Sequence, residues 1–173
     1  NAMILGLVGF MLLDRLDMRA TPELAAGPTG LVLMGGAFAT LLAQWGLIPY
    51  LRMGPRTSTL WGMALAAAGC TMVAYSYSLH AIAAGFALAS LGFGLFRPGF
   101  TAGSSLAVTR AEQGQVAGIV ASVNGAAYIV APAIGVALYN IAPFESFAII
   151  IGLCMFVLVW GRRALQADEV LVR

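Results

Sequence analysis

Long apolar segments separated by short polar breaks divide the chain into six predicted helices. Backbone groups within hydrocarbon must be satisfied internally, which selects helices unless strands alternate as they do in a barrel. No such alternation is present, so the pattern predicts an all-α integral membrane bundle. The expected helices lie near residues 3–14, 28–50, 57–78, 80–107, 114–140 and 143–162.

The first of these segments is short for a membrane span, which needs about 20 residues. It also lacks the basic start and small-residue cleavage site of a signal peptide, and residue 1 is Asn. We therefore expect a truncated first helix. Either the natural chain begins upstream, or the first two residues are foreign to it.

Composition agrees with a membrane location. The chain is 61% hydrophobic and 9% charged, whereas soluble domains have about 25% charged residues. It contains no lysine, and its net charge of +2 gives no basic footprint for nucleic acid. The two cysteines lie in separate apolar segments without metal-ligand spacing, so we expect no metal and no cofactor.

The arginines indicate an orientation. Two of them, Arg15 and Arg19, lie on one side of the predicted bundle. By the positive-inside rule the richer side, with the C-terminus and a tail at 163–173, is cytoplasmic, and we expect the membrane to be a bacterial inner membrane. The arginines of that side are Arg52, Arg56, Arg110, Arg162, Arg163 and Arg173.

The breaks between segments contain recognisable loop signals. In "TRAEQGQ", Thr109 and Glu112 have the spacing of a capping box, which predicts a helix start soon after Thr109. The last segment is bulky and ends in Trp160 and two arginines, which is typical of a peripheral helix anchored at the interface. The segments 80–107 and 114–140 are rich in small residues, and we expect them to be central.

The segment 80–107 has two distinct faces when its residues are placed 100° apart. One face is a polar stripe that consists of Ser90, Gly94, Arg97, Thr101, Ser104 and Ser105. The other face carries small residues that permit close helix packing, with Gly99 and Gly103 as a GxxxG pair. The glycines of this packing face are Gly85, Gly92, Gly99 and Gly103.

Arg97 is the residue of greatest interest on the polar stripe. A charged residue near a helix centre costs roughly 2.5–3.5 kcal/mol, so it indicates a functional site by default. Its predicted depth, roughly 24 Å from the outer end of the helix, lies toward the cytoplasmic side. Two readings stay open: an arginine that snorkels to the interface, or one that acts in gating or substrate exit. Pro98 frees a backbone carbonyl, so we expect a hinge there.

The segment 114–140 carries a small face and a polar face. Gly118, Ser122 and Gly125 are candidates for helix packing, and Pro132 on the same face is a second hinge candidate. Asn124 and Tyr128 are one turn apart, and they are suited either to lining a cavity with Arg97 and Thr101 or to bonding a neighbouring helix. Thr40 and Gln44 form a similar pair with the same ambiguity, and Gln44 is a further cavity candidate.

These residues resemble the major facilitator superfamily of transporters. The stretch that runs from "LGFGLFRPGFTAGSS" to "GVALY" looks like helices ten and eleven of its drug/proton antiporter branch, the tetracycline-efflux type. The stretch "FMLLDRLDMRATPELAAGPTGLVLMGG" is similar to the end of helix seven, its loop and helix eight. The most specific spacing is carried by Gln113, Gly114, Gly118, Ser122, Pro132, Gly135, Leu138 and Tyr139.

Two shorter stretches extend the resemblance. "LRMGPRTSTLWG" looks like the degenerate copy of the family's basic gating loop, with Arg52, Gly54 and Arg56 in the matching places and without the aspartate of the stronger copy. "VAPAIGVAL" resembles the repeat partner of the helix-five antiporter motif, with Ala131 in place of a glycine. The resemblance makes Arg52, Gly54 and Arg56 gating candidates.

The resemblance implies a six-helix half of a transporter with alternating access. Helices seven, eight, ten and eleven would line the cavity, and helices nine and twelve, here 57–78 and 143–162, would lie outside it. The implied function is proton-coupled efflux of small amphipathic compounds. The implied partners are a missing N-terminal half, the small-molecule substrate, protons and the lipid bilayer.

Two other classes of function compete with a transporter. An intramembrane enzyme needs a nucleophile with a base, but the one histidine, His80, is predicted at the opposite surface from Ser104 and Ser105, so we expect no enzyme. A stand-alone six-helix assembly or scaffold stays open, because glycine-lined helices suit oligomerisation equally well. No carboxylate lies deep within a predicted span, since Asp14, Asp17, Glu112 and Glu145 all lie at segment ends. The sequence therefore does not locate a proton-coupling acid.

Overall fold

A computed structural model describes residues 1–168, and the described chain is helical without strands. Residues 169–173, which include Arg173 and the end of the expected 163–173 tail, lie outside the described residues. The α-helices are α1 (Ala2–Arg15), α2 (Ala26–Leu41), α3 (Ile48–Tyr50), α4 (Pro55–Tyr75), α5 (Leu79–Leu106), α6 (Gln113–Ile141) and α7 (Pro143–Ala164). A 3₁₀ turn, η1 (Pro22–Ala25), precedes α2, and a π-helical turn, η2 (Leu42–Leu47), joins α2 to α3.

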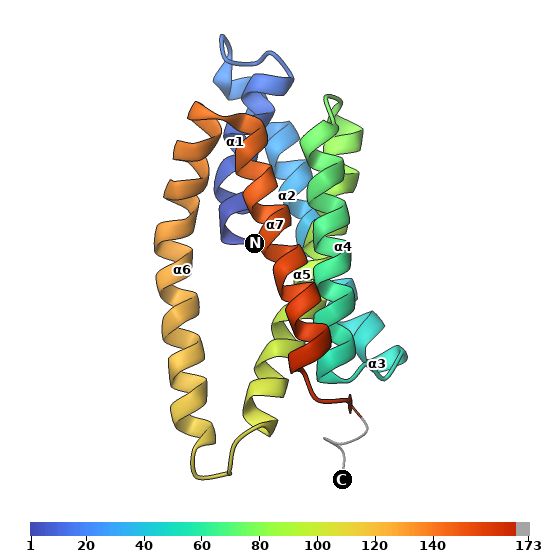
Figure 1. The fold of residues 1–173 in the computed structure, drawn as a ribbon. Coiled ribbons are helices and arrows are strands. Elements are labelled where there is room, and N and C mark those ends of the chain that lie inside the picture. Colours follow the sequence, from blue (N-terminus) through green and yellow to red (C-terminus); the bar gives the residue numbers. More distant parts are fainter. Residues whose placement is uncertain (169–173) are drawn as a thin grey trace.

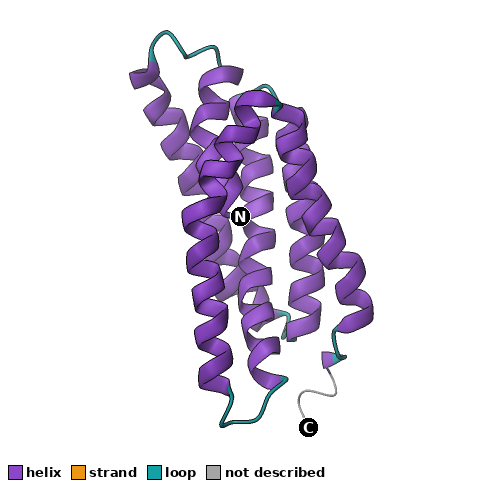
Figure 2. Cartoon of the chain, turned by 60° about the vertical axis from the view of Figure 1, so that its left-hand side comes forward, coloured by secondary structure: helices purple, strands orange, loops and turns teal. Residues whose placement is uncertain are grey.

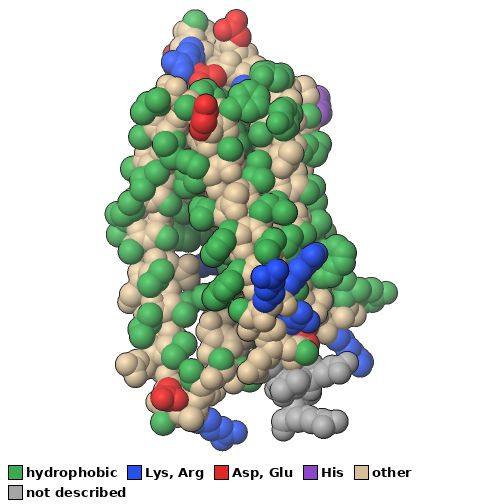
Figure 3. Space-filling model, in the orientation of Figure 1, with side chains coloured by type: hydrophobic (Ala, Val, Ile, Leu, Met, Phe, Trp, Pro, Cys, Tyr) green, Lys and Arg blue, Asp and Glu red, His purple; other side chains and the backbone are tan. Residues whose placement is uncertain are grey.

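This result confirms the all-α prediction. Five helical stretches are long and apolar enough to cross a membrane: Pro22–Tyr50, α4, α5, α6 and α7. The first helix, α1, has 14 residues. Figure 1 shows the long helices running side by side, with the connection after α5 and the end of α7 at one end of the bundle and the connection after α1 at the other. In Figure 3 most of the lateral surface between the two ends is hydrophobic (green) or uncharged (tan).

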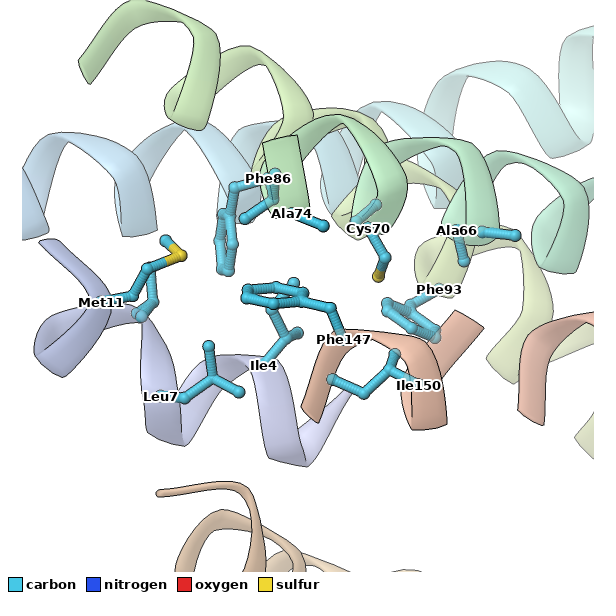
Figure 4. Close-up of a cluster of buried hydrophobic side chains, with 14 of the residues drawn as sticks. Ile4, Leu7, Met11, Ala66, Cys70, Ala74, Phe86, Phe93, Phe147 and Ile150 are labelled. Carbon is cyan, nitrogen blue, oxygen red and sulfur yellow. The ribbon is translucent and has the colours of Figure 1, made fainter. Parts of the chain in front are cut away.

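The core lies where α1, α4, α5 and α7 converge. Ile4, Leu7 and Met11 repeat at intervals of three or four residues, which places them on one face of α1. Figure 4 shows these side chains pointing toward Phe86 of α5 and Phe147 of α7. All five side chains are buried, so burial of this apolar face fixes α1 against the other helices.

The helices α4 and α5 pack most closely, and glycines on both make this possible. An added Cβ on Gly92 would meet the backbone of Ala66 and lie 2.5 Å from the carbonyl oxygen of Gly62, and an added Cβ on Gly69 would meet the backbone of Ala89. Gly85, Gly92 and Gly99 of α5 are spaced by seven residues, a repeat that keeps the same face toward a neighbouring helix. The α4–α5 interface therefore rests on backbone-to-backbone contact.

The predicted GxxxG pair does not behave as a unit. An added Cβ on Gly99 would lie 2.9 Å from the Pro55 carbonyl oxygen, but one on Gly103 would find only the Pro55 side chain, at an ordinary 3.5 Å. Close approach of α4 therefore ends near Gly99. Gly62 and Gly69 of α4, which complete the interface, were not among the residues that the sequence predicted for packing.

The expected central position of 114–140 is wrong for the described chain. Only 6% of the most apolar stretch of α6 is buried, against 56% for α4 and 50% for α5. Figure 2 shows α6 as a long helix without loops or breaks. Its closest contacts are with α1, where Gly6 faces Pro132 and Gly135 faces Met3, and it also contacts α7 through Tyr139 and Phe147. Small residues permit close packing but do not determine which helix packs against them. The abundance of small residues in this segment therefore led to a wrong prediction of its position.

The connection between α5 and α6 contains one of the two reciprocal bonds of the predicted capping box, and the N-cap residue of α6 is Glu112 instead of Thr109. The Glu112 carboxylate accepts hydrogen bonds from the Thr109 backbone N–H (3.1 Å) and hydroxyl (2.6 Å), and α6 begins at Gln113. These two bonds hold the pKa of Glu112 below its usual value. The side chain is therefore ionised at neutral pH, with its negative charge at the helix N-terminus, where the helix dipole favours it.

Candidate functional site

A cavity of about 310 Å³ lies between α5, α6 and α7, next to the first turn of α1. Its polar side chains include Arg97 of α5 with Asn124 and Tyr128 of α6. Figure 3 shows the molecule hollowed on this face, between α6 and the rest of the bundle. The cavity is lined by Asn1, Ala2, Met3, Met63, Phe93, Phe96, Arg97, Asn124, Ala127, Tyr128, Ala131, Ile150, Leu153, Cys154 and Val157.

Arg97 and Tyr128 are in direct contact across this cavity. An Nη atom of Arg97 lies 3.5 Å from the Tyr128 hydroxyl, and the guanidinium carbon is 5.6 Å from the centre of the tyrosine ring. The Asn1 side-chain amide donates a second hydrogen bond to the same hydroxyl, at 3.2 Å. The tyrosine ring therefore provides a partial, cation–π compensation for the arginine charge.

Three of the five predicted cavity residues meet here, and two do not. Thr101 is exposed one turn beyond Arg97, and its hydroxyl donates to the Arg97 carbonyl oxygen at 2.9 Å. Gln44 lies on η2 and does not line this cavity. Arg97, Asn124 and Tyr128 come together because Asn124 and Tyr128, one turn apart on α6, line the same cavity as Arg97 of α5.

Gln44 instead lies in the π-helical turn of residues 42–47. Pro49, a few residues later, has no N–H to donate to the Trp45 carbonyl, and its ring disfavours regular α geometry at that point. The wider turn accommodates the missing hydrogen bond. The sequence contained this signal in Pro49, but periodicity alone does not predict a π turn.

The polar stripe of α5 divides into two parts. Its upper part packs against α2: Thr40 donates a hydrogen bond to the Ser90 carbonyl oxygen at 3.2 Å, and an added Cβ on Gly94 would lie 3.1 Å from the Thr40 Cα atom. From Arg97 onward the surroundings of the stripe differ: Arg97 lines the cavity, and Thr101 is exposed. Of the two alternatives left open for Thr40, lining a cavity or bonding a neighbouring helix, the structure shows the bond to a neighbouring helix.

The helices α4 and α7, which the resemblance placed outside the cavity, form one wall of it. Met63 of α4 and Ile150, Leu153 and Cys154 of α7 are all among its lining residues. The expectation that 57–78 and 143–162 lie outside the cavity is therefore wrong for this cavity. The apolar side chains of these helices give the cavity its hydrophobic side.

The other packing and hinge candidates have varied surroundings. Gly118 and Gly125 have open space where a Cβ would be, and the Ser122 hydroxyl donates to the Gly118 carbonyl oxygen of its own helix. Helix α5 continues through Pro98, and α6 continues through Pro132. Pro132 lies against Gly6 of α1, with an added Cβ on that glycine only 2.6 Å from the proline Cβ.

The gating candidates lie together at the start of α4. Arg52 lies two residues beyond the end of α3 and has a φ of 48°, in the left-handed region. The N–H of Met53 donates to the Ile48 carbonyl oxygen at 3.1 Å, an arrangement that commonly follows a helix end. Gly54 is the N-cap residue of α4, and the Arg56 guanidinium donates to the Arg162 carbonyl oxygen of α7 at 3.1 Å. The structure thus joins this loop to the end of α7.

Asp168 makes the strongest contact with this loop. Its carboxylate accepts hydrogen bonds from the backbone N–H groups of Arg56 (2.8 Å) and Thr57 (3.0 Å) and from the Thr57 hydroxyl (2.5 Å). A carboxylate at a helix N-terminus satisfies free N–H groups and interacts favourably with the helix dipole. An added Cβ on Gly54 would overlap the Asp168 side chain, so Gly54 makes this approach possible.

The Asp168 contact gives a testable expectation. Replacing Asp168 with Ala removes the carboxylate that accepts hydrogen bonds from the N–H groups of Arg56 and Thr57. These amides should then exchange hydrogen about five- to thirtyfold faster, which corresponds to a lost cap of roughly 1–2 kcal/mol. Hydrogen–deuterium exchange with mass spectrometry measures this. Glu23→Ala, at an exposed acid in η1, is the control and should leave these amides unchanged. Equal exchange in both variants would show that Asp168 does not cap α4.

Arg15 is a further residue whose contacts the sequence did not indicate. Its guanidinium donates to the carbonyl oxygens of Val73, Ala74 (3.0 Å) and Ser76 (2.6 Å) at the end of α4, and it lies 5.3 Å from the ring centre of Tyr77. Terminal helix carbonyls have no partner within the helix, and a cation there is favourable. Arg15 therefore ties the end of α1 to the end of α4.

Comparison with family models, with curated proteins and with solved structures gives no match for this chain.

Proposed function

We propose that this chain is the C-terminal six-helix half of a major facilitator-type secondary transporter, and that it exports small amphipathic compounds in exchange for protons. The observation that carries the proposal is the meeting of Arg97, Asn124 and Tyr128 at one cavity within a bundle of membrane-length helices. Intramembrane polar and charged residues that share a cavity are typical of substrate pathways. The sequence resemblance supplies the transporter class and the coupling ion.

The exposed side of α6 agrees with a half-transporter. Secondary transporters of this architecture bind their solute between two halves. A helix at the boundary between the halves would therefore have one face that its own half does not cover. Asn124 and Tyr128 lie on that least buried helix. The uncovered face of α6 would meet the N-terminal half. The loops that contain Arg52 and Arg110 would lie on the arginine-rich, cytoplasmic side.

Export measurements on the whole natural protein test this proposal. Cells or inverted vesicles that carry it should export a fluorescent amphipathic dye, and Tyr128→Ala should lower the rate about tenfold, as expected for losing a hydrogen bond and a cation–π contact to Arg97. Tyr50→Ala is the matched control, because Tyr50 is 85% exposed and lies outside the cavity. Equal export rates for the two variants, at equal protein levels, would remove this cavity from the transport pathway.

A stand-alone six-helix assembly is the second candidate. The observation that favours it is the open space beside Gly118 and Gly125, where another α6 could approach closely. The gene sequence upstream of Asn1 discriminates between the two. Six further apolar segments in frame support the transporter, whereas a start codon next to Met3 supports the assembly.

A further inference from the structure

The cavity has a specific chemical character. Its lining includes the aromatic side chains of Phe93 and Phe96, aliphatic side chains of α7, and a single charged side chain, Arg97. No carboxylate is among the described residues that line it.

Arg97 has incomplete electrostatic compensation in this surrounding. Its contacts are a 3.5 Å approach to a neutral hydroxyl and the face of the Tyr128 ring. The described chain contains an ion pair between Arg19 and Asp14, but none that involves Arg97. Arg97 is an exposed side chain that lines the cavity, and hydrogen bonds from a guanidinium to an anion are stronger than those to neutral groups, so the cavity favours a negatively charged occupant.

The arrangement also selects the shape of that occupant. A guanidinium is planar and binds carboxylate, sulfonate or phosphate oxygens through two parallel hydrogen bonds. The Asn124 amide at the same cavity can donate a further hydrogen bond. The aromatic and aliphatic wall is suited to an apolar body attached to the anionic group.

We propose that this cavity binds an amphipathic organic anion, with its charged group at Arg97 and its apolar body against Phe93 and Phe96. The inference rests on the proposed function, because it names the solute class of the same site. The anion has two possible sources: a soluble organic acid, or the headgroup and chain of an anionic lipid.

Two fluorescent probes with the same aromatic body test the inference. 1-Anilinonaphthalene-8-sulfonate carries a negative charge, and N-phenyl-1-naphthylamine does not. In the whole protein in nanodiscs of phosphatidylcholine, Arg97→Gln should weaken sulfonate binding about tenfold to hundredfold and change binding of the neutral probe by less than about twofold. Arg97→Lys keeps the charge and should retain most of the sulfonate affinity. Empty nanodiscs give the background signal of both probes.

Each outcome of the probe measurements either supports or contradicts the binding of an anion at Arg97. Unchanged sulfonate binding in Arg97→Gln, or an equal loss for both probes, would overturn the inference. If that variant does not fold, competition in the unmodified protein gives the answer: naphthalene-1-sulfonate should displace the bound sulfonate probe at least about tenfold better than neutral 1-naphthalenemethanol, and equal displacement would contradict the inference. Displacement by added phosphatidylglycerol would identify a lipid as the anion, and resistance to it would identify a soluble compound; both results keep the proposed class.

The same probes distinguish this inference from the proposed function. Binding that depends on Arg97, without export by the whole protein, would sink the transporter proposal and leave the inference standing. Export of neutral and cationic dyes, without Arg97-dependent binding of the sulfonate, would do the reverse.

Discussion

Gly92→Ala should destabilise the protein by about 1–3 kcal/mol. The new methyl group would meet the backbone of Ala66 and lie 2.5 Å from the Gly62 carbonyl oxygen. Backbone atoms cannot rotate out of the way as a side chain can, so α4 and α5 would have to separate along their most intimate contact. Thermal unfolding of the detergent-solubilised protein measures the loss.

Gly118→Ala is the matched control for this substitution. Gly118 has open space where the methyl group would be placed, and alanine favours a helix over glycine by about 1 kcal/mol. The control should therefore be neutral or slightly stabilising. A Gly92→Ala variant as stable as the Gly118→Ala variant would show that α4 and α5 do not pack as described.

Arg15→Ala should cost about 2–3 kcal/mol of stability, because it leaves the carbonyl oxygens at the end of α4 without their charged donor. Arg15 contacts three of these oxygens and also lies near the rings of Tyr77 and Phe147. Chemical or thermal unfolding in detergent measures the effect. Hydrogen exchange should accelerate at the connection between α4 and α5 as well.

Arg19→Ala is the comparison at the same end of the bundle. Arg19 pairs with Asp14, but its side chain is 71% exposed, and exposed ion pairs contribute about 0–1 kcal/mol. The two arginines lie four residues apart in sequence, yet their replacement should differ several-fold in effect. Equal losses would mean that Arg15 contributes only as a surface charge and does not cap α4.

Hydropathy predicted the six helices because membrane-length apolar runs leave few structural choices. The segments 80–107 and 114–140 became α5 (Leu79–Leu106) and α6 (Gln113–Ile141), and the capping-box spacing placed the start of α6 soon after Thr109. These features depend on neighbours in sequence. Local pattern determines them, so the sequence alone was sufficient.

Features that depend on distant partners were less predictable. Helical periodicity placed Gly94 and Arg97 on one stripe, but α2 covers Gly94 while Arg97 faces a cavity. No local pattern indicated that Asp168 reaches the start of α4, 111 residues along the chain from Thr57. The position of α6 was predicted wrongly for the same reason, because small residues show that close packing is possible but do not show which helix packs there.

The central claim is that the cavity beside Arg97 is a water-accessible path for a solute, and cysteine accessibility tests it most directly. In the whole natural protein, with its native cysteines replaced by alanine, Asn124→Cys should react with a membrane-impermeant thiosulfonate reagent, because Asn124 lines the cavity. Bound 1-anilinonaphthalene-8-sulfonate should slow that reaction. Ile129→Cys, at a side chain that is 78% exposed but outside the cavity, should react slowly with or without the probe. An Asn124→Cys variant that reacts no faster than the Ile129→Cys variant, or that the probe does not protect, would contradict the account.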